Sequence, residues 1–440
     1  MALMRFLVII LICWESRMVK QYLLPLSLFC LSLVANAAPK EIIFWHSMAG
    51  QLGEEVVRLS NQFNASQEGY RVKPVYKGDY MESLTSFAAA FRAKHPPHLL
   101  QVSEVGTSVM RSPIGIIKPV EDLMREQGMD IEKQRFYPAV LSNYSSNNLL
   151  LAMPFNVSVP VLFYNADVLA KFGVSRESFP KTWDELESLA KHLRDKGYSC
   201  TYTTAYPAWI LLESYQAIQG LRGAKADSVD NPQKDVLAHI NRMRRWQLQH
   251  YFVYGGRGDD ATVLFTSGIC PIFSQSSGGY AALSELVPFH LGVAPMPLDS
   301  ANHMTRHNNV IGGAALWVVA GQPRDIERGV ALFLAFLSQP LIQHTWYEHT
   351  GYLPLDKRSL DSSFNNSGSY ILDIAKLDLN HANDGSFSSQ SGAENQIRVI
   401  NDQMLEAIFS GMMSSEEAMS RALSRIQHVS QRFKKNTGMF

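Results

Sequence analysis

The stretch Ser274–Leu286, SQSSGGYAALSEL, places hydroxyl residues and two glycines directly before an apolar helical pattern. Residues of these types leave backbone N–H groups exposed at the positive end of a helix, where a phosphate group is stabilised. An ordinary helix start has the same local composition. The stretch therefore leaves two interpretations open, an anion-binding site and a plain helix start.

Two charged residues elsewhere stand in patterns that are typical of binding. Arg398 lies among Ile397, Val399 and Ile400, and an arginine in apolar company needs an anionic partner. That partner is either a ligand or an internal carboxylate in a structural salt bridge. Glu104 ends a predicted strand, where ligands of open α/β sheets gather and where a carboxylate accepts hydrogen bonds from a polyol. A helix N-cap or a surface charge is the alternative for Glu104.

Motifs of catalysis are missing from the sequence. It contains no His-Glu-x-x-His helix, nucleophile elbow, P-loop or glycine-rich dinucleotide fingerprint, and no spacing that predicts a metal site. Lys and Arg number 40 and so do Asp and Glu, which argues against nucleic acid as a partner. We therefore expect a binding protein that is not an enzyme and holds no cofactor.

The N-terminus is typical of an export signal. A lysine, an apolar run from Tyr22 to Val34 and the sequence Ala35–Ala37 predict a signal peptide over residues 1–37 with cleavage near Ala37. The run is too short to span a membrane comfortably. Met18 is our preferred start, with residues 1–17 as a spurious extension; a tandem signal or membrane anchor is the alternative.

The elements that must position these side chains alternate between strand and helix. Apolar runs predict strands in 41–47, 71–78 and 98–106, with helices in 53–65 and 81–94 between them. This rhythm predicts an α/β fold with parallel strands. A second α/β region follows Leu149–Asn165, and its capping box, Thr182 with Glu185, predicts a helix start. The Ser/Asn/Gly-rich segment 361–395 predicts a long surface loop.

Two cysteines remain after the signal peptide, Cys200 and Cys270. In an oxidising compartment such a pair can form a disulfide. Two separate buried thiols are the alternative, and the sequence does not decide between them.

Seven segments together carry a family resemblance. They are FWHSMAGQLGEEVVRLSNQFN, VYKGDY, FRAKHPPHLLQVSEVGTSVM, PKTWDEL, VIGGAALWVV, TGYLPL and QIRVI, in this order. The chain resembles, from about Glu41 to its end, the glycerol-phosphate-binding branch of the maltose-binding-type solute receptors of ABC importers. VYKGDY, QVSEVGT and QIRVI point to this branch, whereas TWDEL is generic to the wider family.

The resemblance implies a periplasmic-binding-protein type II fold, with two α/β lobes joined by a hinge around a ligand cleft. Lobe one would hold residues 38–154 and 291–348, and lobe two residues 155–290 and 349–440. It also implies a periplasmic monomer that binds sn-glycerol 3-phosphate, with glycerophosphodiesters such as glycerophosphocholine as further ligands. The expected partners are inner-membrane ABC permease subunits with their ATPase. A sugar or maltodextrin receptor of the same fold and a secreted phosphoesterase are the alternatives.

The family's binding positions carry over residue by residue. Tyr80 and Glu104 are expected at the glycerol hydroxyls. The phosphate is expected among Ser158, Ser276, Gly313, Tyr352 and Arg398, with Gly313 offering its backbone N–H.

Two positions near the predicted site depart from the family. The family has two tryptophans, three residues apart, lining the cleft of the second lobe, and this chain has Tyr206 and Trp209. A tyrosine still stacks on carbon–hydrogen surface and adds a hydroxyl. The family also has Asn-Ser-Ser where this chain has Asn156-Val157-Ser158, so one hydroxyl is lost and the other is kept.

Overall fold

Strands of the first half form most of one mixed sheet, in the order β2-β1-β3-β13-β4, with β7 also paired to β13. β1 and β3 are parallel, as the alternating pattern predicts, whereas β13 runs antiparallel to β3, β4 and β7. All five residues of β3 are buried, which is typical of a strand covered on both faces. The strands are β1 (Lys40–His46), β2 (Tyr70–Tyr76), β3 (Leu99–Ser103), β4 (Ile117–Lys118), β7 (Met153–Ser158) and β13 (Gly312–Val319).

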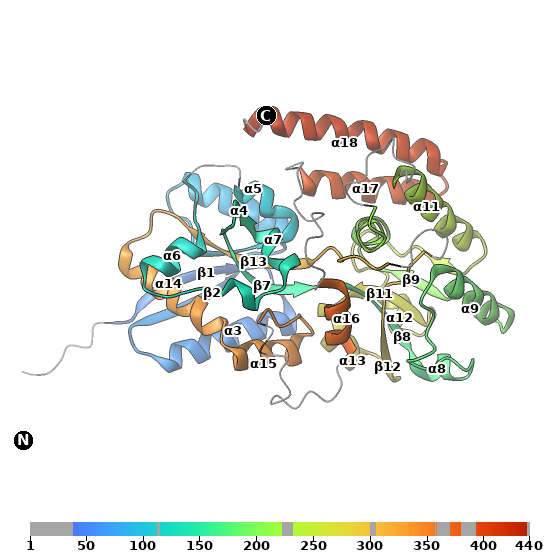
Figure 1. Cartoon of the computed structure of the whole chain (residues 1–440), viewed down its shortest axis with the longest axis horizontal. Helices are drawn as coiled ribbons and strands as arrows, with labels where there is room; N and C mark the ends of the chain where they lie inside the picture. The colour runs from blue at the N-terminus through green and yellow to red at the C-terminus, as the bar shows by residue number, and fades with distance from the viewer. Residues whose placement is uncertain are drawn as a thin grey trace, which may run out of the picture. The chain divides into compact units, whose positions relative to one another are not determined.

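A second sheet has the strand order β10-β9-β11-β8-β12. β9 is parallel to both β10 and β11, and β8 is antiparallel to β11 and β12. Figure 1 shows helices packed around each of the two sheets. The strands are β8 (Pro160–Asn165), β9 (Tyr202–Thr204), β10 (Phe252–Val253), β11 (Ile272–Ser276) and β12 (Leu291–Pro295).

The structure is a computed structural model, and it describes residues 38–111, 115–221, 232–299, 305–356, 358, 370–379 and 393–437. The predicted signal peptide lies outside the described residues. The chain divides into two units, Met1–Lys40 and Glu41–Phe440, and the site described below belongs to the second. Among the described residues, no helix combines the length and the apolar character needed to cross a bilayer.

Two strands lie in a different sheet from the one that the expected lobe limits give them. β12, at 291–295, pairs with β8 of the second sheet, although the expected limits put these residues in lobe one. β7 continues to Ser158 in the first sheet, although residues from 155 on were expected in lobe two. Both shifts follow from backbone pairing, because β12 adds to the edge of β8 and β7 adds to β13.

Around the first sheet, α3 (Gly50–Ser66) and α4 (Tyr80–Arg92) match the predicted helices 53–65 and 81–94. α4 starts at a capping box in which the Asp79 carboxylate accepts the N–H groups of Met81 and Glu82. α14 buries the apolar residues Val330, Phe333 and Leu334. The helices are α3 (Gly50–Ser66), α4 (Tyr80–Arg92), α5 (Thr107–Arg111), α6 (Val120–Glu126), α7 (Pro138–Tyr144), α14 (Arg324–Leu337) and α15 (Pro340–Thr350).

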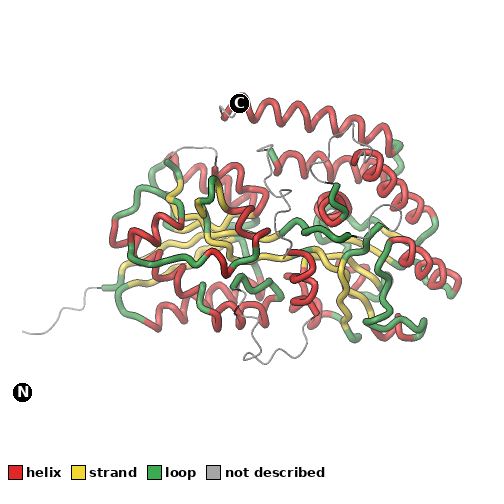
Figure 2. The backbone as a smooth tube through the Cα atoms, in the orientation of Figure 1, coloured by secondary structure: helices red, strands yellow, loops and turns green. Residues whose placement is uncertain are grey.

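The helices around the second sheet include the long C-terminal pair α17 and α18, which lie side by side (Figure 2). The predicted capping box of Thr182 and Glu185 is confirmed at the start of α9. The helices are α8 (Ala166–Ala170), α9 (Trp183–Asp195), η4 (Ala208–Ser214, a π-helix), α10 (Tyr215–Ile218), α11 (Pro232–Leu248), α12 (Thr262–Thr266), α13 (Tyr280–Leu286), α16 (Tyr370–Leu379), α17 (Glu394–Phe409) and α18 (Ser415–Thr437).

One part of the predicted surface loop is wrong. Within 361–395, residues Tyr370–Leu379 form helix α16, and its apolar side chains, among them Ile371 and Ile374, are buried. Their helical spacing outweighs the Ser/Asn/Gly composition around them. The rest of this segment, apart from 393–395, lies outside the described residues.

The cysteines form a disulfide. Cys200 precedes β9 and Cys270 precedes β11, and the two are bonded and fully buried. Because β9 and β11 are paired in parallel, the disulfide ties together the starts of two neighbouring strands. The alternative of two separate thiols is thereby excluded.

Candidate ligand-binding site

A cleft of ≈ 1310 Å³ lies between residues of the two sheets and of α17 and α18. All nine residues that the resemblance assigns to a ligand line this one cleft, although they are spread over more than 300 positions of the sequence. They are Tyr80, Glu104, Ser158, Tyr206, Trp209, Ser276, Gly313, Tyr352 and Arg398. Their roles toward a ligand stay a prediction, but their convergence does not follow from local sequence patterns.

Arg398, on α17, has two carboxylate partners in the cleft wall. Its Nε and Nη2 donate to the two oxygens of Glu213 at 3.0 and 2.6 Å, and its Nη1 donates to Glu104 at 2.7 Å. Burial opposes the charge of the guanidinium, but Glu213 and Glu104 together raise its pKa above the ordinary value. Of the two partners expected from sequence, ligand or internal carboxylate, the structure shows the carboxylate. Two of the five N–H donors of Arg398 have no partner among the residues that the structure describes.

Glu104 lies directly after the carboxyl end of β3, at the start of the short 3-10 helix η2 (Glu104–Gly106). Burial raises the pKa of its carboxyl, and the charge of Arg398 and its hydrogen bond only partly oppose that rise. The predicted position at a strand end is therefore confirmed. Its carboxylate faces the cleft with Arg398 as a hydrogen-bond donor.

Two tyrosine hydroxyls lie near Glu104. Asn156 of β7 donates to the Tyr80 hydroxyl at 3.1 Å and accepts a hydrogen bond from Gln101 at 2.8 Å. The Tyr80 oxygen is thus an acceptor within the protein, and no residue that the structure describes accepts its proton. Burial raises the pKa of both Tyr80 and Tyr352, so both hydroxyls stay protonated at neutral pH.

The Tyr352 ring fits closely against the serine and glycine cluster. A Cβ on Gly278 would lie 2.5 Å from this ring, so only glycine allows the approach. The Ser276 hydroxyl accepts the N–H of Gly278 at 3.2 Å, as a cap of the 3-10 helix η5 (Ser277–Gly279) that leads into α13. The cluster is therefore a helix start and also part of the cleft wall.

Ser158 and Gly313 lie where β7 and β13 pair irregularly. Gly313 has φ +95°, and a Cβ there would lie 1.6 Å from the carbonyl oxygen of Asn156. The register between the two strands shifts at Ala314. Glycine is thus required at 313 for both its backbone conformation and the close approach of β7.

Tyr206 and Trp209 form an aromatic part of the wall. Their ring centroids are 6.4 Å apart with the planes at 68°. Tyr206 adopts φ +43°, which is uncommon for a residue other than glycine and often marks a functional position. The indole Nε1 of Trp209 is buried without a hydrogen-bond partner among the described residues, so it is a donor available to a ligand.

Two acidic residues of the site were not predicted from sequence. Glu213, in the π-helix η4, holds Arg398, and Asp402 lies one turn after Arg398 on α17 and lines the cleft. Burial raises the pKa of Asp402 to about 6, although the Ala208 N–H and the charge of Arg398 oppose that rise. A lone acidic residue in the apolar run of η4 was the available signal for Glu213.

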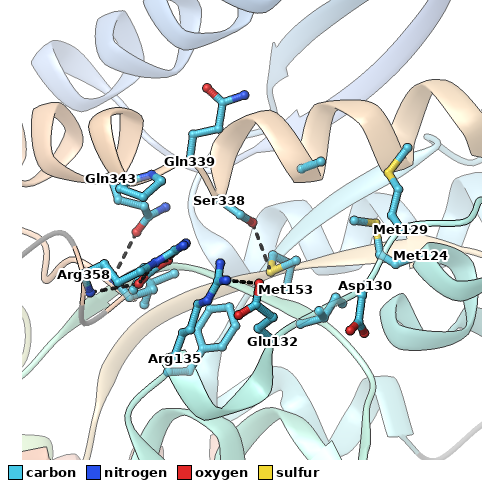
Figure 3. A pocket seen from close by; sticks show the side chains of 16 residues that line it. Met124, Met129, Asp130, Glu132, Arg135, Met153, Ser338, Gln339, Gln343 and Arg358 are labelled. Atoms are coloured by element: carbon cyan, nitrogen blue, oxygen red, sulfur yellow. Dashed lines mark hydrogen bonds and ion pairs between the residues drawn. The ribbon is translucent and has the colours of Figure 1, made fainter.

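A second cavity, of ≈ 260 Å³, lies away from this cleft and is lined by Met124, Met129 and Met153 with polar residues around them (Figure 3). Four of its charged groups form two ion pairs. Arg135 pairs with Glu132, and Arg358 pairs with Asp356. This cavity contains none of the predicted site residues. Among the described residues, no three His, Cys, Asp or Glu side chains are grouped so that they could hold a metal.

Two sheets covered by helices, which share a cleft lined by hydroxyls, aromatic rings and a partly buried arginine, define a solute receptor of the type II class. The chain belongs to the family of bacterial extracellular solute-binding proteins, whose family model matches residues 58–367.

Comparison with individual proteins gives a closer grouping. The chain is 37% identical over 424 residues to the sn-glycerol-3-phosphate-binding periplasmic protein UgpB of Escherichia coli strain 536, and the match covers 92% of this chain and 96% of that protein. The corresponding protein of strain K12 is 36% identical over the same length. The chain is thus a homologue of UgpB.

Solved structures confirm the fold. UgpB of Mycobacterium tuberculosis in complex with glycerophosphocholine superposes with a TM-score of 0.72 at 20% identity and covers 90% of this chain and 99% of that one. Maltose-bound MalE3 of Thermotoga maritima also gives a TM-score of 0.72, at 16% identity, over 88% of this chain and 99% of that one. At these identities the likeness concerns the fold alone.

Proposed function

We propose that this chain is the periplasmic substrate-binding subunit of an ABC importer for sn-glycerol 3-phosphate. The observation that carries the proposal is the convergence of all nine predicted residues on one cleft, among them the partly buried guanidinium of Arg398. The named UgpB relatives support the ligand class, since the chain matches them over nearly their whole length. Binding makes and breaks no covalent bond in this proposal.

The arrangement can hold a phosphate ester at both of its ends. The phosphate would take N–H donors of Arg398 and the hydroxyls of Ser158, Ser276 and Tyr352, which together supply charge and directed hydrogen bonds. Glu104 and the Tyr80 hydroxyl would take the glycerol end. Closure of the lobes over the ligand would then present a distinct form to the permease and its ATPase.

The size of the cleft favours a ligand range that includes glycerophosphodiesters. Its ≈ 1310 Å³ exceeds the roughly 300–1,000 Å³ of typical small-molecule sites, and glycerol 3-phosphate alone would leave much of it to water. The aromatic pair Tyr206 and Trp209 offers a surface for a head group. We therefore include diesters such as glycerophosphocholine in the proposed ligand class.

The test is a titration of the chain without residues 1–37. Calorimetry with glycerol 3-phosphate, glycerophosphocholine, glycerol, inorganic phosphate and maltose should give the tightest binding for the two phosphate esters. Binding of maltose without binding of either ester would favour the sugar receptor instead. Release of phosphate from the esters would favour the phosphoesterase.

A further inference from the structure

Glu104 and Glu213 hold the same guanidinium from different sides. Glu213 takes the Nε–Nη2 edge of Arg398 with both oxygens and is not part of the cleft lining, so it lies behind the guanidinium. Glu104 takes Nη1 and lines the cleft itself. Glu213 comes from η4, which packs against α17, whereas Glu104 follows β3 of the first sheet. The pair Glu104–Arg398 therefore bridges the two sides of the cleft.

In the structure described, the side chains of Glu104, Glu213 and Arg398 together do not attract an anion. Two carboxylates around one guanidinium leave one negative charge in excess when both are ionised. A phosphate that reaches Arg398 competes with the Glu104 carboxylate for it. Glu213 is a poor candidate for displacement, because its bidentate bond lies on the side away from the cleft.

Within the described part of the chain, displacement of Glu104 from Arg398 would leave the Glu104 carboxylate without a cation. Besides Arg398, Glu104 interacts electrostatically with Glu213 and with the tyrosines Tyr80, Tyr144 and Tyr352, none of which is a cation. A buried carboxylate that loses its partner is strongly unfavourable unless new hydrogen-bond donors replace it. Ligand hydroxyls are such donors.

We propose that Glu104 is a built-in competitor of the ligand phosphate, and that binding is an exchange. The phosphate takes Arg398 from Glu104, and hydroxyls of the same ligand take the released carboxylate. This inference rests on the proposed function and narrows its ligand class to phosphate esters with free hydroxyl groups that reach Glu104. Glu104 is then a specificity-determining residue, because an ester without hydroxyls releases its carboxylate and does not satisfy it.

The experiment compares glycerol 3-phosphate with n-propyl phosphate, which has the same phosphate end and no hydroxyl. Calorimetry on the wild-type chain should show a preference for glycerol 3-phosphate. In Glu104→Gln the competing charge is gone, so n-propyl phosphate and inorganic phosphate should each bind at least fivefold more tightly than to the wild type. The variant also removes the carboxylate that accepts hydrogen bonds from the hydroxyls of glycerol 3-phosphate. The ratio of the affinity for glycerol 3-phosphate to that for n-propyl phosphate should therefore be smaller than in the wild type.

Glu213→Gln is the matched control, because it removes the same charge from the same guanidinium on the other side. This variant should weaken the binding of both esters and leave the ratio of their affinities unchanged, since Glu213 positions Arg398 and does not compete with the phosphate. An equal gain for n-propyl phosphate in both variants would overturn the exchange, because charge number alone would explain it. An equal loss of affinity for both esters in Glu104→Gln would also overturn the proposed exchange. Wild-type protein that binds neither ester would overturn the proposed function as well.

Discussion

Arg398 and Glu104 are 294 positions apart in the sequence, and their side chains meet at 2.7 Å. One comes from the penultimate helix described and the other from the end of a central strand of the first sheet. The bond therefore depends on the whole fold and not on any local segment. It places the partly buried guanidinium of Arg398 at the point where both sides of the cleft contribute an acid.

Arg398→Ala should weaken glycerol 3-phosphate binding by more than tenfold, or about 1.4 kcal/mol. The variant removes the planar donor group and breaks the ion pairs of Glu104 and Glu213 with Arg398. Arg398→Lys should also bind weakly, because an ammonium cannot form the bidentate bond to Glu213. Calorimetry measures both, with Arg245→Ala, which removes an exposed surface pair with Glu187, as the control. Unchanged affinity in Arg398→Ala would exclude Arg398 as the phosphate ligand.

Gly313→Ala should destabilise the protein by roughly 3 kcal/mol or more. Its Cβ would lie 1.6 Å from the Asn156 carbonyl oxygen at a positive φ, so β7 and β13 would have to separate. Gly321→Ala has a similar φ of +80° and no atom within 4 Å of the new Cβ, and it should cost only about 1 kcal/mol. Urea denaturation compares the two variants. Equal losses would mean that the backbone conformation alone matters at 313.

The pH dependence of stability should change in Asp402→Asn. The folded state holds the Asp402 proton up to a pKa of about 6, above the usual 3.8, so it binds more protons than the unfolded state between these values. This residue therefore makes the wild type less stable as pH rises from about 4 to 6. At pH 7.5 the variant should be more stable than the wild type by on the order of 1 kcal/mol, and this gain should vanish near pH 4. Thermal unfolding at both pH values measures it, and a gain independent of pH would contradict the explanation.

Removal of the disulfide should affect stability far more than binding. The bond closes a loop over 70 positions, so a Cys200→Ala, Cys270→Ala double variant should lose about 4 kcal/mol in the chain-entropy account. Neither cysteine lines the cleft, and glycerol 3-phosphate affinity should stay within about twofold. Urea denaturation and calorimetry on the same preparation separate the two effects. A large loss of affinity would show that the second sheet needs the disulfide to form the cleft.

Local patterns predicted the elements of the first sheet well. The expected strands 41–47 and 98–106 contain nearly all of β1 and β3, because buried strands and amphipathic helices carry period signals that need no tertiary information. Composition was misleading for α16, where a short apolar helix lies within a polar, loop-like segment. The lobe limits implied by the resemblance did not place β12 with the second sheet, since pairing with β8 leaves no mark in the strand's own sequence.

The family resemblance predicted which side chains gather in the cleft, but not how they pair. Arg398 in apolar company required an anion, and nothing nearby in the sequence indicated Glu213, which lies 185 positions earlier. The partner of a buried charge is chosen by the tertiary fold, and a single sequence shows only that a partner is needed. Asp402 was missed for a similar reason, because an acid on a polar helix face looks solvated until the helix is packed.

Val159 is the single residue between β7 of the first sheet and β8 of the second, and Ser277 hydrogen-bonds both its N–H, at 3.2 Å, and its carbonyl oxygen, at 2.9 Å. When two domains rotate about a hinge, the residues close to the hinge move least. If the two sheets rotate toward each other around a bound ligand, with the hinge at Val159, then Ser158 moves little. Side chains farther from the hinge move over larger distances. The Ser158 hydroxyl would then contact the ligand before closure and keep that contact unchanged while the cleft closes.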